Sequence, residues 1–329
     1  MVRFFLSLFL ISSLFGYEYL IKFSHVVSPD TPKGKAVEYF AKRVEELSGG
    51  RIKVKVYPNG ELAQDNVVIR KMLINNQVQM AAPSIAKFTS IVPELGVFDV
   101  PFLFKDEMHV RRVFDGDIGK RLLNRLSQEG YVALGYWSNG FKEITNNKRP
   151  IIYPQDIRGL KIRVMSSKIL VEQYKALGAI AISMSFSRVY EALKNGYIDG
   201  EENTISTIYV EKFYKVQRYM TLTNHGYLGY IVVVSPDFWA SLPDDLKKVI
   251  KKAFREATIK GRKWAIELNK RALKKLQKIA REGKFRIDYL TPEDRMRWKK
   301  IMIRKVYPKF YRVVGKKLIK EIMKLENVN

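Results

Sequence analysis

The chain has 329 residues, of which 47% are hydrophobic and 28% charged, a balance that indicates a folded protein and excludes a disordered one. It contains no cysteine, which excludes disulfide bonds and a lipid anchor on an N-terminal cysteine. The formal net charge is +26, and 28 Lys or Arg against 8 Asp or Glu lie from Leu246 onward, so most of the excess belongs to the last quarter of the chain.

The N-terminus has the pattern of an export signal. Arg3 precedes an apolar run from Phe4 to Phe15. This run is shorter than the roughly 20 residues of a membrane-spanning helix, but it suits the core of a signal peptide. We predict that residues 1–16 are a signal peptide and that the mature protein is periplasmic and does not itself span a membrane. A buried N-terminal helix is the alternative.

Strands and helices alternate through the first part of the mature chain. Residues 17–26 predict a strand, residues 31–50 an amphipathic helix that two glycines end, and residues 51–60 a strand of period two. A helix near residues 66–76 and a short apolar strand at 78–84 follow. This β-α-β-α-β order predicts a mainly parallel sheet covered by helices.

Two polar residues of this part lie where such sheets bind ligands. Open parallel sheets hold ligands beyond the carboxyl ends of their strands. His25 and Ser84 both lie at such ends, so we treat both as candidate binding residues.

A second α/β unit follows a turn-rich crossing at residues 139–159. Two similar units predict an α/β fold of two lobes around a cleft. Lobe I would hold residues 17–141 with 229–268 returning to it. Lobe II would hold residues 142–228, with the C-terminal helices at 269–329 packing on it.

The basic last quarter has apolar residues at helical spacing, among them Ile250, Phe254 and Leu273. This predicts a long amphipathic helix, beginning near Asp244, whose Lys and Arg face solvent and which braces both lobes. A polyanion-binding surface is the alternative. The predicted export and the lack of a helix-turn-helix, zinc-finger or RNA-binding motif favour the solvated helix, so we expect no nucleic-acid partner.

Arg163 raises a question of charge, because it lies in a predicted strand at residues 160–164 beside the expected cleft. A buried guanidinium without an anion costs several kcal/mol, so it needs a partner. A protein carboxylate, such as that of Asp156 or Glu172, meets this need, and so does a bound anionic ligand.

The chain contains four long runs in this order: NGFKEITNNKRPI, GLKIRVMSSKILVEQYKALGA, MSFSRVYEALKNGYIDGEEN and NHGYLGYIVVVS. Together with SHVVSPDTPKG, YPNGEL and QMAAPSIAKF, they closely resemble the DctP family of substrate-binding proteins of TRAP transporters (tripartite ATP-independent periplasmic transporters). The resemblance covers essentially the whole mature chain. It implies a periplasmic-binding-protein-like fold with hinge strands. It also implies capture of a small organic acid anion by cleft closure, and delivery by a monomer to the small and large membrane subunits.

The resemblance also implies binding residues position by position. Arg163 would form a two-pronged ion pair with the ligand carboxylate, which fixes both its charge and its plane. Asn203 would hold the same carboxylate, and Phe186 would pack on the ligand as the lobes close. Ser84 and Asp65 are similar to first-lobe contacts. The structural alternatives are a core position for Phe186, a helix cap for Asp65 and a strand end for Ser84.

Lys142 stands where sialic-acid-binding relatives have arginine, and the run from Asn224 to Tyr230 is more similar to members that bind four-carbon dicarboxylates. A second carboxylate requires a second cation, which Lys142 would supply, while Tyr227 and Tyr230 would offer hydroxyls. A structural lysine is the alternative. The implied ligand is succinate, fumarate or malate; another organic acid, or ligand sensing for a signalling partner, remains open.

Nothing in the sequence indicates an enzyme. The three histidines are widely scattered, and no HExxH motif or close histidine pair suggests a zinc site. Asp199, Glu201 and Glu202 lack the alternating ligands of a calcium loop, and there is no phosphate loop or G-x-S-x-G elbow. We expect binding without catalysis, metal or cofactor.

Overall fold

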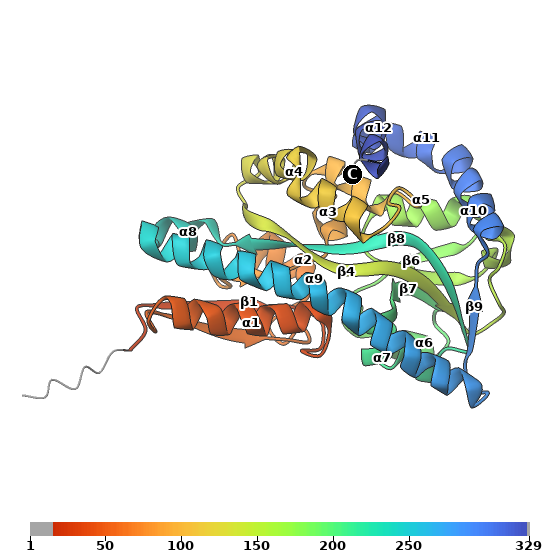
Figure 1. Ribbon diagram of the computed structural model, residues 1–329, viewed down its shortest axis with the longest axis horizontal. Coiled ribbons are helices and arrows are strands. Elements are labelled where there is room, and N and C mark those ends of the chain that lie inside the picture. The colour runs from red at the N-terminus through yellow and green to blue at the C-terminus, as the bar shows by residue number, and fades with distance from the viewer. Residues whose placement is uncertain (1–15, 328–329) are drawn as a thin grey trace, which may run out of the picture.

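The structure is a computed structural model that describes residues 16–327. The predicted signal peptide, up to residue 15, lies outside the described residues. One mixed sheet runs through the described part, in the order β2-β1-β3-β8-β4-β7-β5-β6, with β9 beside β8 (Figure 1). Its strands are β1 (Tyr19–Ser24), β2 (Ile52–Tyr57), β3 (Met80–Ala81), β4 (Val132–Asn146), β5 (Lys161–Val164), β6 (Ile180–Ser183), β7 (Gly200–Thr204), β8 (Tyr219–Val234) and β9 (Arg286–Tyr289).

Helices cover both faces of the sheet. In Figure 1, α1 and α9 lie on one side of the long strands, and α3, α4, α5 and the C-terminal helices lie on the other. The helices are α1 (Pro32–Leu47), α2 (Asp65–Val67), α3 (Glu107–Asp115), α4 (Asp117–Gln128), α5 (Lys168–Ala176), α6 (Val189–Lys194), α7 (Ile205–Val210), α8 (Pro236–Ser241), α9 (Asp244–Arg281), α10 (Pro292–Lys305), α11 (Tyr307–Phe310) and α12 (Lys316–Lys324).

The residues of β8 show why helices cover both faces of the sheet. Val232 and Val234 pack in the core under α1 and α9, whereas Ile231 and Val233 pack in the core on the opposite face. Successive side chains of a strand point to opposite faces, so a strand buried on both sides is apolar throughout. The run YIVVV at the end of β8 has this composition.

Strands β4 and β8 pair with each other along almost their whole length, from Val132 opposite Val234 to Asn146 opposite Tyr219. The short strand β3 adds to one end of β8, and β7 adds to the opposite end of the pair, along β4. We call the part with β1–β3 lobe I and the part with β5–β7 lobe II. The exact boundaries, expected near residues 141 and 228, stay a prediction because both strands pass between the lobes without a break.

Helix α9 has 38 residues, a length of about 57 Å. It contacts α1 and β4 as well as α7 and β9, so it touches both lobes. Asn269 connects these elements directly, since its Nδ2 donates to the Asn139 carbonyl at 2.7 Å and its Oδ1 accepts from the Ser206 amide at 2.8 Å. The helix has the bracing position that its amphipathic pattern predicts.

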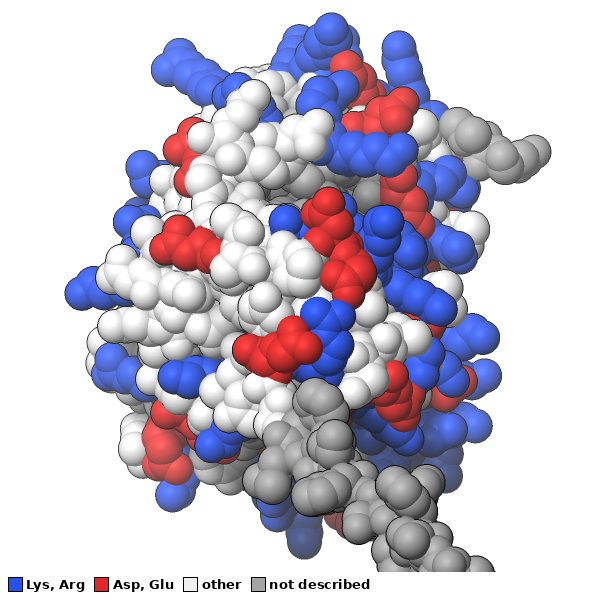
Figure 2. Space-filling view, turned by 90° about the vertical axis from the view of Figure 1, so that its left-hand side faces the viewer, with Lys and Arg blue, Asp and Glu red and all other residues white. Residues whose placement is uncertain are grey.

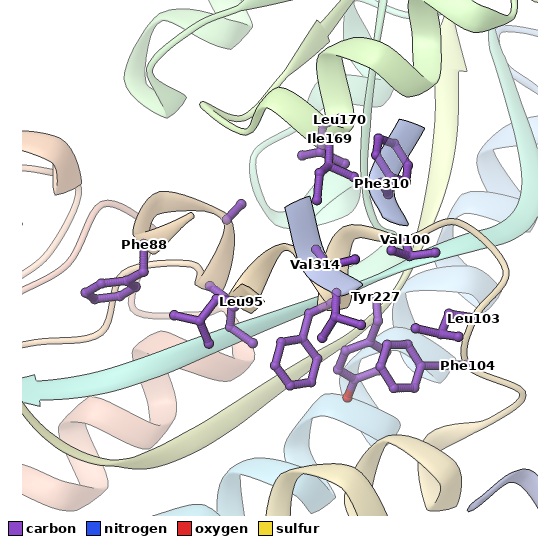
Figure 3. Packing of buried hydrophobic residues seen from close by; sticks show 14 of the residues in the cluster. Phe88, Leu95, Val100, Leu103, Phe104, Ile169, Leu170, Tyr227, Phe310 and Val314 are labelled. Atoms are coloured by element: carbon purple, nitrogen blue, oxygen red, sulfur yellow. The ribbon is translucent and has the colours of Figure 1, made fainter. Parts of the chain in front are cut away.

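The C-terminal helices contact segments of both lobes. Trp298 Nε1 donates to the Ile152 carbonyl, which follows β4, at 2.8 Å, and Tyr307 Oη donates to the Pro101 carbonyl at 2.8 Å. Figure 3 shows Phe310 and Val314 in the same apolar cluster as Ile169 of α5. Residues 269–329 were expected to pack on lobe II. They also contact residues 101–112, which belong to lobe I.

No helix of residues 16–327 combines the length and the apolar character needed to cross a membrane.

We predict that Gly200, the first residue of β7, tolerates no side chain. A Cβ there would lie 2.1 Å from the Thr145 carbonyl oxygen, which is fixed by the sheet. Gly200→Ala should lower the free energy of unfolding by about 2–3 kcal/mol, measured in urea. Gly196→Ala is the matched control: its Cβ meets nothing within 4 Å, so its φ of +71° alone should cost about 1 kcal/mol. Equal losses in the two variants would show that β7 is not held this tightly.

Candidate functional site

A small, partly enclosed cavity lies between the lobes. Seven of the nine predicted binding residues line it: Asp65, Ser84, Lys142, Arg163, Phe186, Asn203 and Tyr230. The remaining lining residues are Val26, Val27, Lys33, Lys87, Met165, Glu202, Thr207 and Leu228.

Arg163 lies on β5 with 2% of its surface exposed. Its Nε and Nη2 donate to the Met184 carbonyl at 3.2 and 3.0 Å. No Asp or Glu oxygen of residues 16–327 comes within 4.0 Å of its guanidinium. Burial lowers its pKa, an effect that Glu201 and Glu202 oppose. The cation is thus desolvated, and its hydrogen bonds to the protein go to a neutral carbonyl.

The two carboxylates named from the sequence as possible partners of Arg163 are engaged elsewhere. Asp156 Oδ2 accepts from the backbone amides of Ile152 and Tyr153 at 2.9 and 2.7 Å. Glu172 pairs with Lys309 at 3.0 Å. Of the two partners left open by the sequence, a ligand anion is the one that this geometry favours.

Asn203 lies at the end of β7 and faces the cavity. Its Nδ2 donates to Glu201 Oε2 at 3.1 Å, and its Oδ1 accepts from the Thr204 amide at 3.1 Å. One Nδ2 hydrogen remains for a ligand oxygen. Phe186 stands beside this group, with its ring centroid 5.9 Å from Arg163 Cζ, so it borders the cavity as predicted.

Lys142 is buried and already has a partner. Its Nζ lies 2.6 Å from Glu202 Oε1, and both side chains are 1% exposed. The other oxygen, Oε2, accepts from Tyr174 Oη at 3.0 Å and from His225 Nε2 at 2.8 Å. Burial opposes ionisation of Glu202, but Lys142 and His225 outweigh it and lower the pKa to about 2. Lys142 is therefore ion-paired in this structure, and its predicted role toward a second ligand carboxylate stays a prediction.

Two other lysines supply positive charge from lobe I, and sequence reasoning missed both. Lys33 donates to the Ala82 carbonyl at 3.1 Å and lies over the Tyr230 ring at 4.2 Å. Lys87 donates to Ser166 Oγ at 3.2 Å. Burial lowers the pKa of Lys33, to about 8, and also that of Lys87.

A signal for Lys33 is present in the sequence. Lys33 shares the helical spacing of Ala36, Val37 and Phe40, which are all buried on the inner face of α1. Lysine is rarely buried among apolar residues, so its place in this stripe indicates a specific partner for its charge. The signal for Lys87 is weaker: it lies three residues, about one helical turn, after the predicted binding residue Ser84.

Two predicted residues do not line the cavity. Tyr227 lies on the opposite face of β8 from Leu228 and Tyr230, where its hydroxyl donates to Glu107 Oε2 at 2.7 Å. Figure 3 shows it beside Phe104 in the apolar cluster. His25 is fully buried, and burial together with nearby Lys33 lowers its pKa to about 3, so its ring is neutral.

Within residues 16–327 no three His, Asp or Glu side chains are grouped so as to hold a metal ion. The cavity instead suits an anion, because three cationic side chains, Arg163, Lys33 and Lys87, line it.

Comparison with known proteins agrees with this geometry. Residues 23–313 match the family model described as bacterial extracellular solute-binding protein, family 7 (DctP). The C4-dicarboxylate-binding protein DctB of Bacillus subtilis is 39% identical over 306 residues, which are 93% of this chain and 86% of that protein. The C4-dicarboxylate-binding periplasmic protein DctP of Rhodobacter capsulatus is 42% identical over 284 residues, 86% of this chain and 84% of that one.

A solved structure is similar over the same length. The TRAP periplasmic solute-binding protein of Sulfurospirillum deleyianum, crystallised with bound succinate, superposes with a TM-score of 0.91 at 45% identity, covering 94% of this chain and all of that one. The fold and the site define a solute-binding protein of two α/β lobes, which confirms the predicted fold class. The chain belongs to the DctP family, a family of binding proteins and not of enzymes.

We predict that the Lys142–Glu202 pair matters for stability mainly because neither charge can be left alone. Glu202→Leu should lower the free energy of unfolding by about 3–5 kcal/mol, since it leaves Lys142 buried without an anion. The double variant Lys142→Met, Glu202→Leu should recover a substantial part of this loss. Urea unfolding of the wild type, Glu202→Leu and the double variant measures these losses. A double variant as unstable as Glu202→Leu would contradict the prediction.

The same pair predicts an acid-sensitive contribution. The pKa of Glu202 is about 2 in the folded protein and about 4.5 when unfolded, so its stabilisation is complete above pH 4.5 and is lost as pH falls toward 2. The difference corresponds to about 3 kcal/mol. The stability gap between the wild type and Glu202→Gln, measured in urea, should therefore shrink from pH 5 to pH 2.5. A constant gap would mean that Glu202 is not held ionised.

Proposed function

We propose that the protein captures a four-carbon dicarboxylate, such as succinate, fumarate or malate, between its lobes. Arg163 carries this proposal, because it is a buried cation whose fork can bind a carboxylate through two parallel hydrogen bonds. The remaining Nδ2 hydrogen of Asn203 would bind the same carboxylate. The relatives named above point the same way, since two are named for C4-dicarboxylate binding and one was crystallised with succinate.

The balance of charge supports a dianion. Of the lining side chains, Lys33, Lys87, Lys142 and Arg163 are cationic, whereas Asp65 and Glu202 are acidic. Because Glu202 is matched by Lys142 and Asp65 offsets one of the two lysines of lobe I, one positive charge of lobe I is left for the second carboxylate. We therefore assign the role first given to Lys142 to Lys33 and Lys87.

Closure brings these two groups of cations together. Lys87 of lobe I donates to Ser166 of lobe II at 3.2 Å, and the Ser28 amide donates to Oε1 of Glu211, the residue after α7, at 3.2 Å. A ligand that contacts Arg163 on one side and the lysines on the other binds the closed form better than an open form. Such a ligand shifts the equilibrium toward closure by this difference in affinity.

Membership of the DctP family suggests the step after capture, in which the ligand is passed to a transporter. We propose that the closed, loaded protein is a periplasmic monomer that hands its ligand to the small and large membrane subunits of a TRAP transporter. Another organic acid as ligand, or ligand sensing for a signalling partner, is the alternative that the same site allows. On the face that Figure 2 shows, Lys and Arg lie mainly around the edge and most densely along the right-hand side, with Asp and Glu among them.

We predict that Arg163→Ala lowers the binding free energy of succinate by roughly 3–5 kcal/mol, because the ligand carboxylate loses its charged partner. Isothermal titration calorimetry measures this. Lys161→Ala is the matched control, because Lys161 lies on the same strand with its side chain exposed, and it should bind as the wild type does. Unchanged affinity in a folded Arg163→Ala protein would contradict the assigned site.

A further inference from the structure

Glu201 is a buried acid next to the binding residues that takes no part in lining the cavity. It lies on β7 with none of its surface exposed. In the parallel pairing of β5 and β7 it stands directly opposite Arg163. Paired residues of neighbouring strands point to the same face, so both side chains lie on one side of the sheet.

The contacts of Glu201 fit either protonation state. Oε2 accepts from Asn203 Nδ2 at 3.1 Å, and Oε1 lies 3.2 Å from Thr145 Oγ1. A hydroxyl donates or accepts with equal ease. The carboxylate therefore accepts from Thr145, whereas the neutral acid donates its proton to Thr145 and still accepts from Asn203. No side chain has to move when the proton is gained.

The protonation state of Glu201 changes the net charge around Arg163. Its guanidinium has one positive charge, and Glu201 is the carboxylate with the largest electrostatic effect on it. A ligand carboxylate bound by Arg163 and Asn203 brings a second negative charge to the same place. Two carboxylates that share one site do not both stay ionised at little cost, so the pKa of one of them rises.

We propose, resting on the function proposed above, that Glu201 takes up a proton when the ligand carboxylate binds Arg163, so that ligand capture and protonation of Glu201 are coupled. In the molecules in which Glu201 is ionised before the ligand arrives, it is the counter-charge of Arg163. Once the ligand replaces it in this role, the proton neutralises the surplus charge.

The surroundings of Glu201 support this account. Thr145 of β4 and Asn203 of its own strand hydrogen-bond it, and the charged or titratable groups that act on it electrostatically are Arg163 of β5, Tyr174 of α5 and Glu202 of β7. Burial raises its pKa to about 7, although Arg163 opposes this. Two other groups near the cavity titrate in a neighbouring range, Asp99 with a pKa of about 6 and Lys33 with a pKa of about 8, both displaced by burial.

Calorimetric titration with succinate at pH 7, in two buffers of different ionisation enthalpy, measures the protons taken up per ligand bound. A group with a pKa of about 7 is half protonated at this pH, so the wild type should take up about half a proton. At pH 5.5, where Glu201 is already protonated, the uptake by the protein should fall toward zero once the protons that partly protonated free succinate itself releases on binding are subtracted. Glu201→Gln keeps both hydrogen bonds in neutral form and should reduce the uptake at pH 7 to about a tenth, the share of Lys33. Asp99→Asn is the matched control and should retain the wild-type uptake.

The outcomes separate this proposal from the function on which it rests. Binding of succinate by the wild type without proton uptake at pH 7 overturns the coupling and leaves the proposed function standing. Uptake that is unchanged in a folded Glu201→Gln protein, or that Asp99→Asn abolishes, also overturns the assignment to Glu201. Failure of the wild type to bind succinate or another four-carbon dicarboxylate overturns the proposed function itself.

Discussion

The burial of Arg163 is the constraint on which the rest of the site depends. A guanidinium that is 2% exposed, with hydrogen bonds to a backbone carbonyl, needs negative charge close by. The protein arranges this charge without forming an ion pair of its own at that place. Glu201 stands opposite Arg163 on the neighbouring strand, Glu202 pairs with Lys142, and Asp156 and Glu172 have other partners. The result is a cation that is held in place and still available to a ligand.

The continuous sheet would keep this arrangement intact during the proposed closure of the lobes. Strands β4 and β8 cross from one lobe to the other and stay paired along their length, while β5 and β7 hold Arg163 and Asn203 within one lobe. Lys33 and Lys87 belong to the other lobe, and their pKa values are lowered by burial. An anion bound between the two groups would relieve the cost of burying like charges, which would give the proposed closure a physical cause.

The sequence predicted the parts of the fold and site that depend on local pattern. Period-two strands, the glycines that end α1 and the amphipathic course of α9 were sufficient for the α/β order and the bracing helix. Arg163, Asn203 and Phe186 could be placed because they lie in long motifs shared with a known family. The helix expected at residues 66–76 is instead the short α2 followed by a π-helical turn to Met72, since helical spacing does not distinguish these conformations.

What the sequence could not provide was pairing over long distances. The partner of Lys142 is 60 residues away, so nothing near Lys142 shows that its charge is already matched. Tyr227 and Tyr230 are three residues apart on one strand, which places them on opposite faces, and only the fold shows which face borders the cavity. Lys33 carried a signal in its apolar stripe, but its burial against the Tyr230 ring depends on β8, almost 200 residues later.

The crystal structure of the protein with succinate tests the central claim most directly. The account predicts one ligand carboxylate within about 2.7–2.9 Å of two guanidinium nitrogens of Arg163, and in contact with Asn203 Nδ2. The second carboxylate should lie toward Lys33 and Lys87. Succinate bound away from Arg163, or with its second carboxylate on Lys142 in place of Glu202, would contradict it.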